Sequence, residues 1–388
     1  MAKWDLMLPS LCKAYEGKFL FGNIMSPRDF DTPEFLDMYR HHYNIVTVEN
    51  AMKPMYVAIS PEEYNFTEPD KFADWAEKNG IKLHAHTLIW HAQSPQWLNR
   101  NTDATFLTRT QAKESMEQYI KKYAGRYKGR IYSWDVMNEI MQDLSHFEGD
   151  WRRSLRQEQS RSATSAYWYL AYANGADSSK GESGADYVFD AFYFTRKYDP
   201  EAKLYYNDYN DEVPAKREAI AQMVEQINEQ WKNHPEYDER LLIEGIGMQG
   251  HYNQGTNLAH VRESLERFIK TGAVISITEL DITIGEAPQR PPRAANPPTP
   301  EEWREIMRKA EQTPAPVLTP EQSKLQADMY AALFNLYSEF SEHIERVTFW
   351  AVSDGTSWRK WGAPVLFDQN LQAKEAFHAV INCAGLQK

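Results

Sequence analysis

Short apolar runs recur along the chain and alternate with amphipathic segments of helical period. Eight of the runs read as strands, because they are short and rich in β-branched and aromatic side chains. They cover residues 19–25, 45–50, 81–90, 131–139, 203–210, 241–251, 274–282 and 346–354. The amphipathic segments between them predict helices over residues 33–43, 72–80, 111–127, 215–231, 258–272 and 324–340.

Strands that alternate with helices are typical of a parallel sheet covered by helices. Eight such units predict a closed (β/α)₈ TIM barrel, which a single domain over residues 1–388 can form. Two long excursions interrupt the alternation, one after the fourth strand (141–186) and one after the seventh. The second is a Pro-rich insertion over residues 285–322 with a short helical piece at 301–312, since proline continues neither a strand nor a helix interior.

Composition limits the possible functions. The 388 residues are 42% hydrophobic and 25% charged, which is typical of a soluble protein with a large core. A net charge of -12 argues against nucleic acid and anionic membranes as partners, and no apolar run approaches the length of a membrane span. No signal peptide is visible at the start of the sequence, so a cytoplasmic location is expected. The sequence leaves open whether the protein forms a homo-oligomer.

A few side chains can be placed as buried or exposed from their context. Cys12 and Cys383 are expected to be free buried thiols, with a disulfide between the two ends of the chain as the alternative. His41 and His42 lie in a polar helical segment and are expected at the solvated surface.

Polar or aromatic side chains stand at seven successive predicted strand ends. In a TIM barrel the carboxyl ends of the strands form the face that carries the active site. The side chains are Glu49 and Asn50; His86, Trp90 and Gln93; Asn138 and Glu139; Asp208 and Tyr209; Gln249 and His251; Glu279 and Asp281; Trp350 and Asp354. Asp208 could equally brace neighbouring loops, because strand-end acids serve both purposes.

Two of these acids suit glycoside hydrolysis, which needs one carboxyl group to donate a proton and another to attack or to activate water. Glu139 ends an apolar run beside the neutral Asn138, an environment that raises a carboxyl pKa and suits a proton donor. Glu279 and Asp281 share a strand face by the two-residue period. His251, held by Asp281, could hydrogen-bond to Glu279 and keep it ionised, as a nucleophile requires.

The chain resembles the family 10 glycoside hydrolases, the endo-β-1,4-xylanases. The matching motifs are VTVENAMKP (46–54), HTLIWHAQSPQWL (86–98), WDVMNE (134–139), YYNDYN (205–210), MQGHY (248–252), ITELDI (277–282) and FWAVSDGTSW (349–358). They occur in the family's order, and the resemblance extends from residue 19 to residue 367. In combination these motifs are highly specific, although each alone is weak.

The resemblance implies a (β/α)₈ barrel and a retaining mechanism on xylan or xylooligosaccharides. Neither a cofactor nor a catalytic metal is expected. It makes Glu139 the acid/base and Glu279 the nucleophile, with His251 as the nucleophile's partner. Asn138 would hold the 2-hydroxyl of the sugar being cleaved, with His86 and Gln249 around that same sugar. Further residues match binding positions: Glu49, Asn50, Lys53, Trp90 and Gln93 on the non-reducing side, Tyr209 on the leaving-group side, and Trp350 and Trp358 above the cleft.

Other interpretations of the motifs remain open. A different β-1,4-glycan hydrolase, such as a cellulase or aryl-glycosidase, would share the architecture. The segment GIGMQG (245–250) fits the dinucleotide pattern G-x-G-x-x-G but falls in a predicted strand. His84 and His86, with His91, His251 and Asp354, could form the site of a metal-dependent barrel hydrolase, although Glu139 and Glu279 would then have no role.

Overall fold

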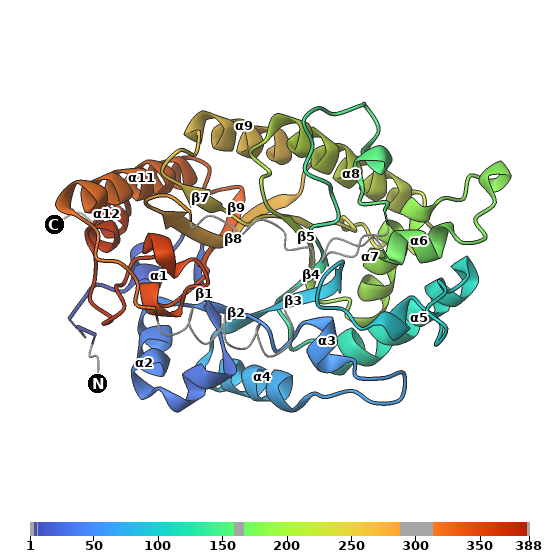
Figure 1. The fold of residues 1–388 in the computed structure, drawn as a ribbon, viewed down its shortest axis with the longest axis horizontal. Helices are drawn as coiled ribbons and strands as arrows, with labels where there is room; N and C mark the ends of the chain where they lie inside the picture. Colours follow the sequence, from blue (N-terminus) through green and yellow to red (C-terminus); the bar gives the residue numbers. More distant parts are fainter. Residues whose placement is uncertain (1–3, 6, 159–166, 288–312, 386–388) are drawn as a thin grey trace, which may run out of the picture.

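Eight parallel strands close into a barrel in the computed structural model, which describes residues 4–5, 7–158, 167–287 and 313–385. The strands are β1 (Leu20–Met25), β2 (Ile45–Val48), β3 (Lys82–Trp90), β4 (Ser133–Asn138), β5 (Lys203–Asp208), β6 (Gly245–Met248), β8 (Val274–Thr283) and β9 (Ile344–Phe349). The sheet closes because β1 pairs with β9 as well as with β2. The predicted (β/α)₈ barrel is confirmed, and Figure 1 shows its strands as a ring inside a layer of helices.

The sixth predicted strand (241–251) is broken in the structure. β6 pairs with β5 and β8, and a short strand β7 (His251–Asn253) continues its path and pairs with β8 alone. Gly250 lies between them with φ of 74°, a left-handed conformation that glycine adopts without a Cβ penalty. The turn therefore separates Gln249, at the end of β6, from His251.

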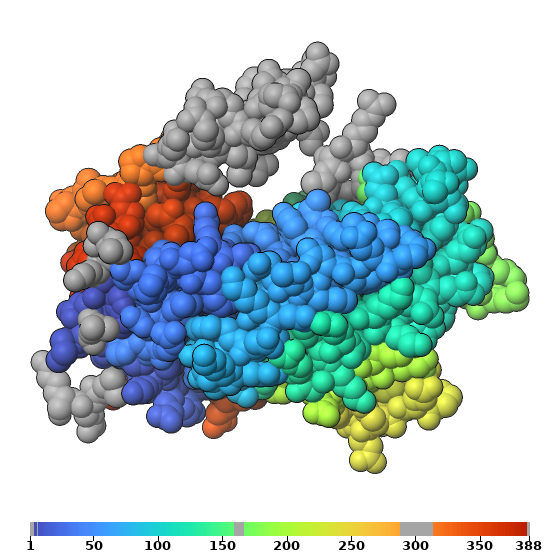
Figure 2. Space-filling view, turned by 90° about the horizontal axis from the view of Figure 1, so that it is seen from below, coloured from blue at the N-terminus to red at the C-terminus, as the bar shows by residue number. Residues whose placement is uncertain are grey.

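Helices cover the outside of the barrel (Figure 1). They are α1 (Leu11–Ala14), α2 (Pro33–His42), α3 (Pro54–Val57), α4 (Thr67–Asn79), α5 (Arg109–Tyr123), α6 (Tyr167–Ala173), α7 (Tyr187–Tyr198), α8 (Pro214–Lys232), α9 (Leu258–Ile269), α11 (Pro320–Glu339) and α12 (Glu375–Cys383). Figure 2, a view from below, shows residues of the first third of the chain forming one continuous face.

The Pro-rich insertion is shorter at its carboxyl end than the sequence predicted. α11 begins at Pro320, so residues 320–322 are helical and the insertion ends before them. Thr319 caps the helix through the backbone N–H of Gln322, and proline fits the first helical position, which needs no N–H donor. The expected helical piece at 301–312 lies outside the described residues.

The excursion after β4 returns to the barrel by an antiparallel bridge between Met141 and Leu155. The 3-10 turn Trp151–Ser154 comes just before this bridge, and the helix α6 follows it before α7 begins. Residues 154–156 therefore lie directly beside the residues that follow Glu139.

Some predictions about burial need correction. His42 is fully buried against Phe367 and Phe377, not exposed, and burial together with the nearby His41 lowers its pKa to about 3. Cys12 and Cys383 are free, as expected, but only partly buried. Within the described ranges, no helix combines the length and apolar character of a membrane span.

Candidate active site

Glu139 and Glu279 lie at the same end of the barrel and are joined by a chain of hydrogen bonds. Gln249 Nε2 donates to Glu139 Oε1 (2.9 Å) and to Asn138 Oδ1 (3.3 Å). Asn207 Nδ2 donates to that same Asn138 oxygen (2.9 Å) and to Glu279 Oε1 (2.9 Å). Four neighbouring strands, β4, β5, β6 and β8, thus place the two carboxylates around one amide.

Glu139 is surrounded by neutral donors. Trp90 Nε1 donates to Glu139 Oε2 (3.0 Å), while Gln249 holds the other oxygen. Burial raises the pKa of Glu139, and the negative charges of Asp208 and Glu279 add to the rise, although the two hydrogen bonds oppose it. A carboxyl group in this environment keeps its proton to higher pH and can donate it.

Glu279 has the opposite environment, because its partner is a cation. His251 Nε2 lies 3.1 Å from Glu279 Oε2, and His251 Nδ1 lies 3.0 Å from Asp281 Oδ2. Burial opposes ionisation of both groups. The two carboxylates nevertheless raise the pKa of His251 to about 10, and the imidazolium lowers the pKa of Glu279. The expected triad forms, and it keeps Glu279 ionised.

Two residues that the sequence analysis did not single out complete this half of the site. Arg359 pairs with Asp281 and donates to Thr283 Oγ1 (3.1 Å), so Asp281 lies between two cations. Asn207 receives a hydrogen bond from Thr278 Oγ1 (2.6 Å), which fixes its amide so that the nitrogen faces Glu279. Asn207 stands in the quoted YYNDYN motif, but only the register of β5 shows that it faces the centre.

The residues expected on the non-reducing side also lie together. Lys53 Nζ donates to Asn50 Oδ1 (2.9 Å) and lies 5.0 Å from the centre of the Trp90 ring. Burial lowers the pKa of this ammonium group, and the carboxylates of Glu279, Glu49 and Glu139 oppose the shift. Lys53 is therefore within electrostatic reach of all three acids.

Glu49 and Gln93 border this group. Glu49 accepts a hydrogen bond from Ser26. Gln93 has a left-handed backbone with φ of 45°, and its buried Oε1 has no hydrogen-bond partner among the described residues. Leaving a buried amide oxygen without a hydrogen-bond donor costs free energy. We therefore expect a bound ligand to supply the missing donor.

Three aromatic residues border the remaining sides. The Trp350 ring centre lies 5.6 Å from that of His86, and the Trp358 ring centre lies 5.3 Å from that of His251. Trp350 is buried, whereas Trp358 is 63% exposed. Tyr209 follows β5, and the Lys216 ammonium lies 3.8 Å from its ring centre. Trp358 and the half-buried Tyr209 therefore offer aromatic faces on which a sugar ring can stack.

The suggested metal grouping does not form. His84 Nε2 and His86 Nδ1 both approach Asp135 Oδ2, at 3.0 and 2.8 Å, and Arg346 Nη2 lies 3.0 Å from His84 Nε2. Asp354 instead pairs with Lys374 (2.9 Å). Among the residues that the structure describes, no three His, Cys, Asp or Glu side chains are placed to hold a metal ion.

The dinucleotide pattern at 245–250 has a packing explanation. Gly245–Met248 is a strand, not a loop that opens a helix. A Cβ at Gly247 would lie 2.4 Å from Asn207 Oδ1, so glycine leaves room for the amide that holds Asn138 and Glu279. This segment therefore does not have the geometry of a phosphate-binding turn.

Asp208 supports the site through contacts that point away from Glu279. It is fully buried, pairs with Lys216 (2.8 Å) and accepts hydrogen bonds from Tyr206 and from the backbone N–H of Tyr209. Because these partners occupy its oxygens, its effect on Glu139 is electrostatic. Of the two roles left open for Asp208, the contacts favour the bracing one.

Comparison with known proteins agrees with this geometry. The sequence model of glycosyl hydrolase family 10 matches residues 10–383. The chain belongs to glycosyl hydrolase family 10. It is a glycoside hydrolase, and the recognition made from the motifs is confirmed.

Relatives in this family match over nearly the whole chain. Endo-1,4-beta-xylanase B of Paenibacillus barcinonensis is 30% identical over 96% of this chain and 98% of its own. Endo-1,4-beta-xylanase A of Halalkalibacterium halodurans is 32% identical over 96% and 86%. Among solved structures, a GH10 xylanase with a bacterial Ig-like domain from termite gut has a TM-score of 0.80 at 33% identity, covering 98% of this chain and 79% of its own.

Proposed function

We propose that this family 10 member is a retaining endo-1,4-β-xylanase. The observation that carries the proposal is the pair Glu139 and Glu279, joined through Asn138 and shifted in pKa in opposite directions. The relatives that match over nearly the whole chain are named endo-1,4-beta-xylanases, which supports xylan or xylooligosaccharides as the substrate.

In the first step, the ionised Glu279 attacks the anomeric carbon of the sugar. The glycosidic C–O bond breaks, and protonated Glu139 gives its proton to the leaving oxygen, so the product is a covalent glycosyl-enzyme and a shortened xylan chain. The low pKa of Glu279 and the raised pKa of Glu139 supply both protonation states at one pH.

In the second step, Glu139 is a carboxylate and takes a proton from water. The water oxygen attacks the anomeric carbon, the bond to Glu279 breaks, and the product keeps its β configuration. Glu139 regains its proton, so the site returns to its starting state. The hydrogen bonds from Gln249 and Trp90 can stabilise Glu139 during the interval in which it is charged.

The other members of the site are assigned to substrate binding in the same proposal. Asn138, His86 and Gln249 hold the sugar being cleaved. Binding on either side falls to Glu49, Asn50, Lys53, Trp90, Gln93, Tyr209, Trp350 and Trp358. The expected cytoplasmic location and a possible homo-oligomer stay predictions.

The substrate is tested with the wild-type protein on matched aryl glycosides. Hydrolysis of aryl xylobioside should exceed that of aryl cellobioside in kcat/KM, and xylan should release reducing ends. Proton NMR of an early time point should show the β-anomer before mutarotation. An equal or higher cellobioside rate would move the substrate to another β-1,4-glycan, and an α-anomer would exclude retention.

A further inference from the structure

Arg156 lies beside Glu139 and hydrogen-bonds to the backbone carbonyl groups of Glu139 and Ile140. Its backbone N–H donates to the Ile140 carbonyl (2.9 Å), and its Nε donates to the Glu139 carbonyl (2.9 Å). The bridge between Met141 and Leu155 brings Arg156 to this position. A residue seventeen positions along the chain thus binds the two carbonyl groups next to the candidate proton donor.

The other arm of Arg156 reaches the leaving-group side. Its Nη2 donates to the Tyr209 hydroxyl (2.9 Å), which donates in turn to Asp143 Oδ2 (3.2 Å). Among the residues that the structure describes, no carboxylate lies within 4 Å of the Arg156 guanidinium as an ion-pair partner. Its contacts are therefore to a peptide carbonyl and a phenol, which suits a fork that holds two groups in place.

Glu139 needs such support because its backbone is left-handed, with φ of 56°. A non-glycine residue in this region is disfavoured unless the surroundings hold it. Any relaxation of this residue turns its Cα–Cβ bond, and with it the direction in which the carboxyl group points. Proton transfer to a leaving oxygen is slowed when the donor carboxyl group is displaced by as little as about 1 Å.

We propose that Arg156 is a positioning residue that locks the backbone of Glu139 and the ring of Tyr209 into one unit, aligning the proton donor with the leaving sugar. The inference rests on the proposed function and concerns only its leaving-group half. The described contacts of Arg156 are with Glu139, Ile140 and Tyr209 and not with Glu279, so attack by the nucleophile should not depend on it.

The test compares substrates that need protonation of the leaving group with one that does not. The variant Arg156→Met removes the side-chain donors, and Arg156→Lys keeps the charge but not the fork. Arg153→Met is the matched control: it comes from the same excursion, its side chain is 65% exposed, and it forms an ion pair with Glu148 (2.6 Å). The substrates are xylotetraose and dinitrophenyl xylobioside, whose phenolate leaves without a proton.

For Arg156→Met we expect kcat/KM on xylotetraose to fall about 30-fold, as loss of a charge-assisted hydrogen bond implies. On dinitrophenyl xylobioside the fall should stay within about 3-fold, because the first step then needs only Glu279. Arg156→Lys should restore little of the xylotetraose rate, since an ammonium group cannot hold both acceptors in a fixed fork. Arg153→Met should leave both rates within about 2-fold.

Equal losses on the two substrates would overturn the proposal, because they would indicate a general effect on folding or on Glu279. Full recovery by Arg156→Lys would also overturn it, since charge alone would then suffice. Wild-type protein inactive on xylotetraose would instead defeat the proposed function itself, a separate result.

A double-mutant cycle with Tyr209→Phe gives a second readout. If Arg156 acts through Tyr209 and Glu139 as one unit, the double variant should be no more than about 2-fold worse on xylotetraose than Arg156→Met alone. Fold-losses that multiply would show that the two side chains act independently, and the link between Arg156 and Tyr209 would be wrong.

Discussion

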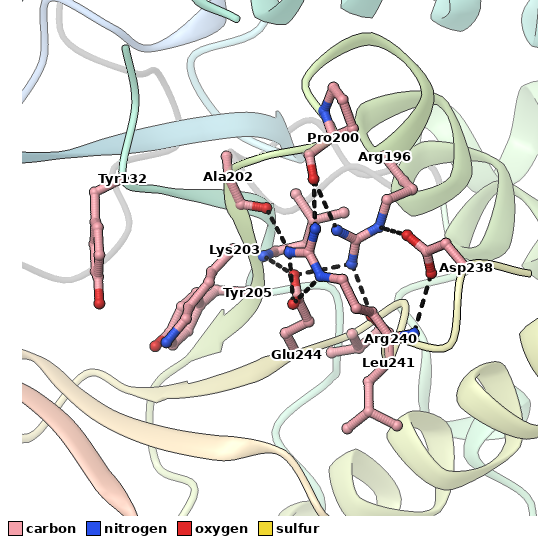
Figure 3. A network of polar contacts seen from close by, with 12 residues as sticks. Tyr132, Arg196, Pro200, Ala202, Lys203, Tyr205, Asp238, Arg240, Leu241 and Glu244 are labelled. Atoms are coloured by element: carbon pink, nitrogen blue, oxygen red, sulfur yellow. Dashed lines mark hydrogen bonds and ion pairs between the residues drawn. The ribbon is translucent and has the colours of Figure 1, made fainter. Parts of the chain in front are cut away.

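Both ends of the barrel contain carboxylates that are at least partly withdrawn from solvent, but the two ends pair these acids with different partners. At the amino-terminal end of the strands, Glu244 pairs with Arg196 (2.9 Å) and Arg240 (2.8 Å), and Asp238 lies 3.5 Å from Arg196 (Figure 3). Close by, Glu345 pairs with Lys203 and accepts hydrogen bonds from tyrosine hydroxyls. Each of these acids has a cationic partner in direct contact.

At the carboxyl-terminal end of the strands, cations in direct contact balance only part of the negative charge. Glu139 has two neutral donors and no cation in ion-pair contact among the described side chains, and its pKa rises. His251 is shared between Glu279 and Asp281. Lys53 donates to an amide, and its pKa falls on burial.

The difference separates charges whose contacts stabilise the fold from charges that the proposed mechanism uses. A carboxylate in direct contact with cations is stabilised in its charged form, so it stays ionised. A carboxyl group that is buried among neutral donors has a raised pKa, so it can hold its proton and release it during a reaction. In a TIM barrel the amino-terminal face serves stability and the carboxyl-terminal face serves chemistry, and the pairing of charges follows the same division.

The largest effect is expected at the two carboxylates themselves. Glu279→Ala and Glu139→Ala should each lower turnover of xylooligosaccharides by about 10⁴-fold or more, since each removes a group that makes or breaks bonds. Azide should rescue Glu279→Ala with an inverted glycosyl azide. With an activated aryl substrate, azide should rescue Glu139→Ala with a retained product. NMR of the azide products gives the configuration, and the opposite pairing would exchange the two roles.

A smaller effect is expected at His251. His251→Asn removes the imidazolium that lowers the pKa of Glu279 while burial remains, so the pKa of Glu279 should rise. In the wild type the acid limb of kcat/KM should lie below pH 4.5, the ordinary pKa of this group. In the variant this limb should move to higher pH, with a loss of about 10²-fold at neutral pH from weaker electrostatic support.

The pH profile separates this role from simple damage to the fold. His343→Asn, at an exposed histidine just before β9, is the control and should leave the profile unchanged. If His251→Asn lowered kcat/KM by the same factor at every pH, the imidazolium would not set the ionisation of Glu279.

The smallest effect on catalysis is expected at the opposite end. Glu244→Gln keeps the shape of the side chain but leaves Arg196, which is 5% exposed, and Arg240 without their shared anion. We expect the free energy of unfolding to fall by about 2–3 kcal/mol, with kcat/KM at 25 °C within about 2-fold of wild type. Denaturant unfolding and steady-state kinetics measure the two quantities.

Glu229→Gln provides a control for that experiment, because its ion pair with Lys232 (3.1 Å) is more than half exposed on both sides. Such a pair contributes little, so its unfolding free energy should stay within about 0.5 kcal/mol of wild type. A loss of activity in Glu244→Gln without a loss of stability would contradict the division between the two ends.

The sequence predicted most of the barrel because period and length are local properties. All eight strand regions were found, and six helices were placed from their amphipathic pattern. α7 was missed because buried residues surround its axis and leave no polar face to mark it. The start of α11 was misplaced because three residues after Thr319 read as a continuation of the Pro-rich insertion.

The candidate site was found from residues that stand at strand ends or in motifs. Asn207, Arg156 and Arg359 were missed for different reasons. Asn207 and Asp208 are adjacent and point to opposite sides, and only the pairing of β5 with its neighbours shows which one faces Glu279. Arg156 and Arg359 come from loops, whose paths no periodic pattern predicts.

By itself the sequence determined the architecture and singled out the two candidate acids, because hydrophobic period fixes which elements form and the strand ends of a parallel barrel must gather at one mouth. Only the tertiary structure decided how those acids differ. Their pKa directions depend on burial and on side chains from other strands, such as Gln249 beside Glu139 and His251 beside Glu279. Those neighbours are far apart in sequence, and electrostatic interactions act through space.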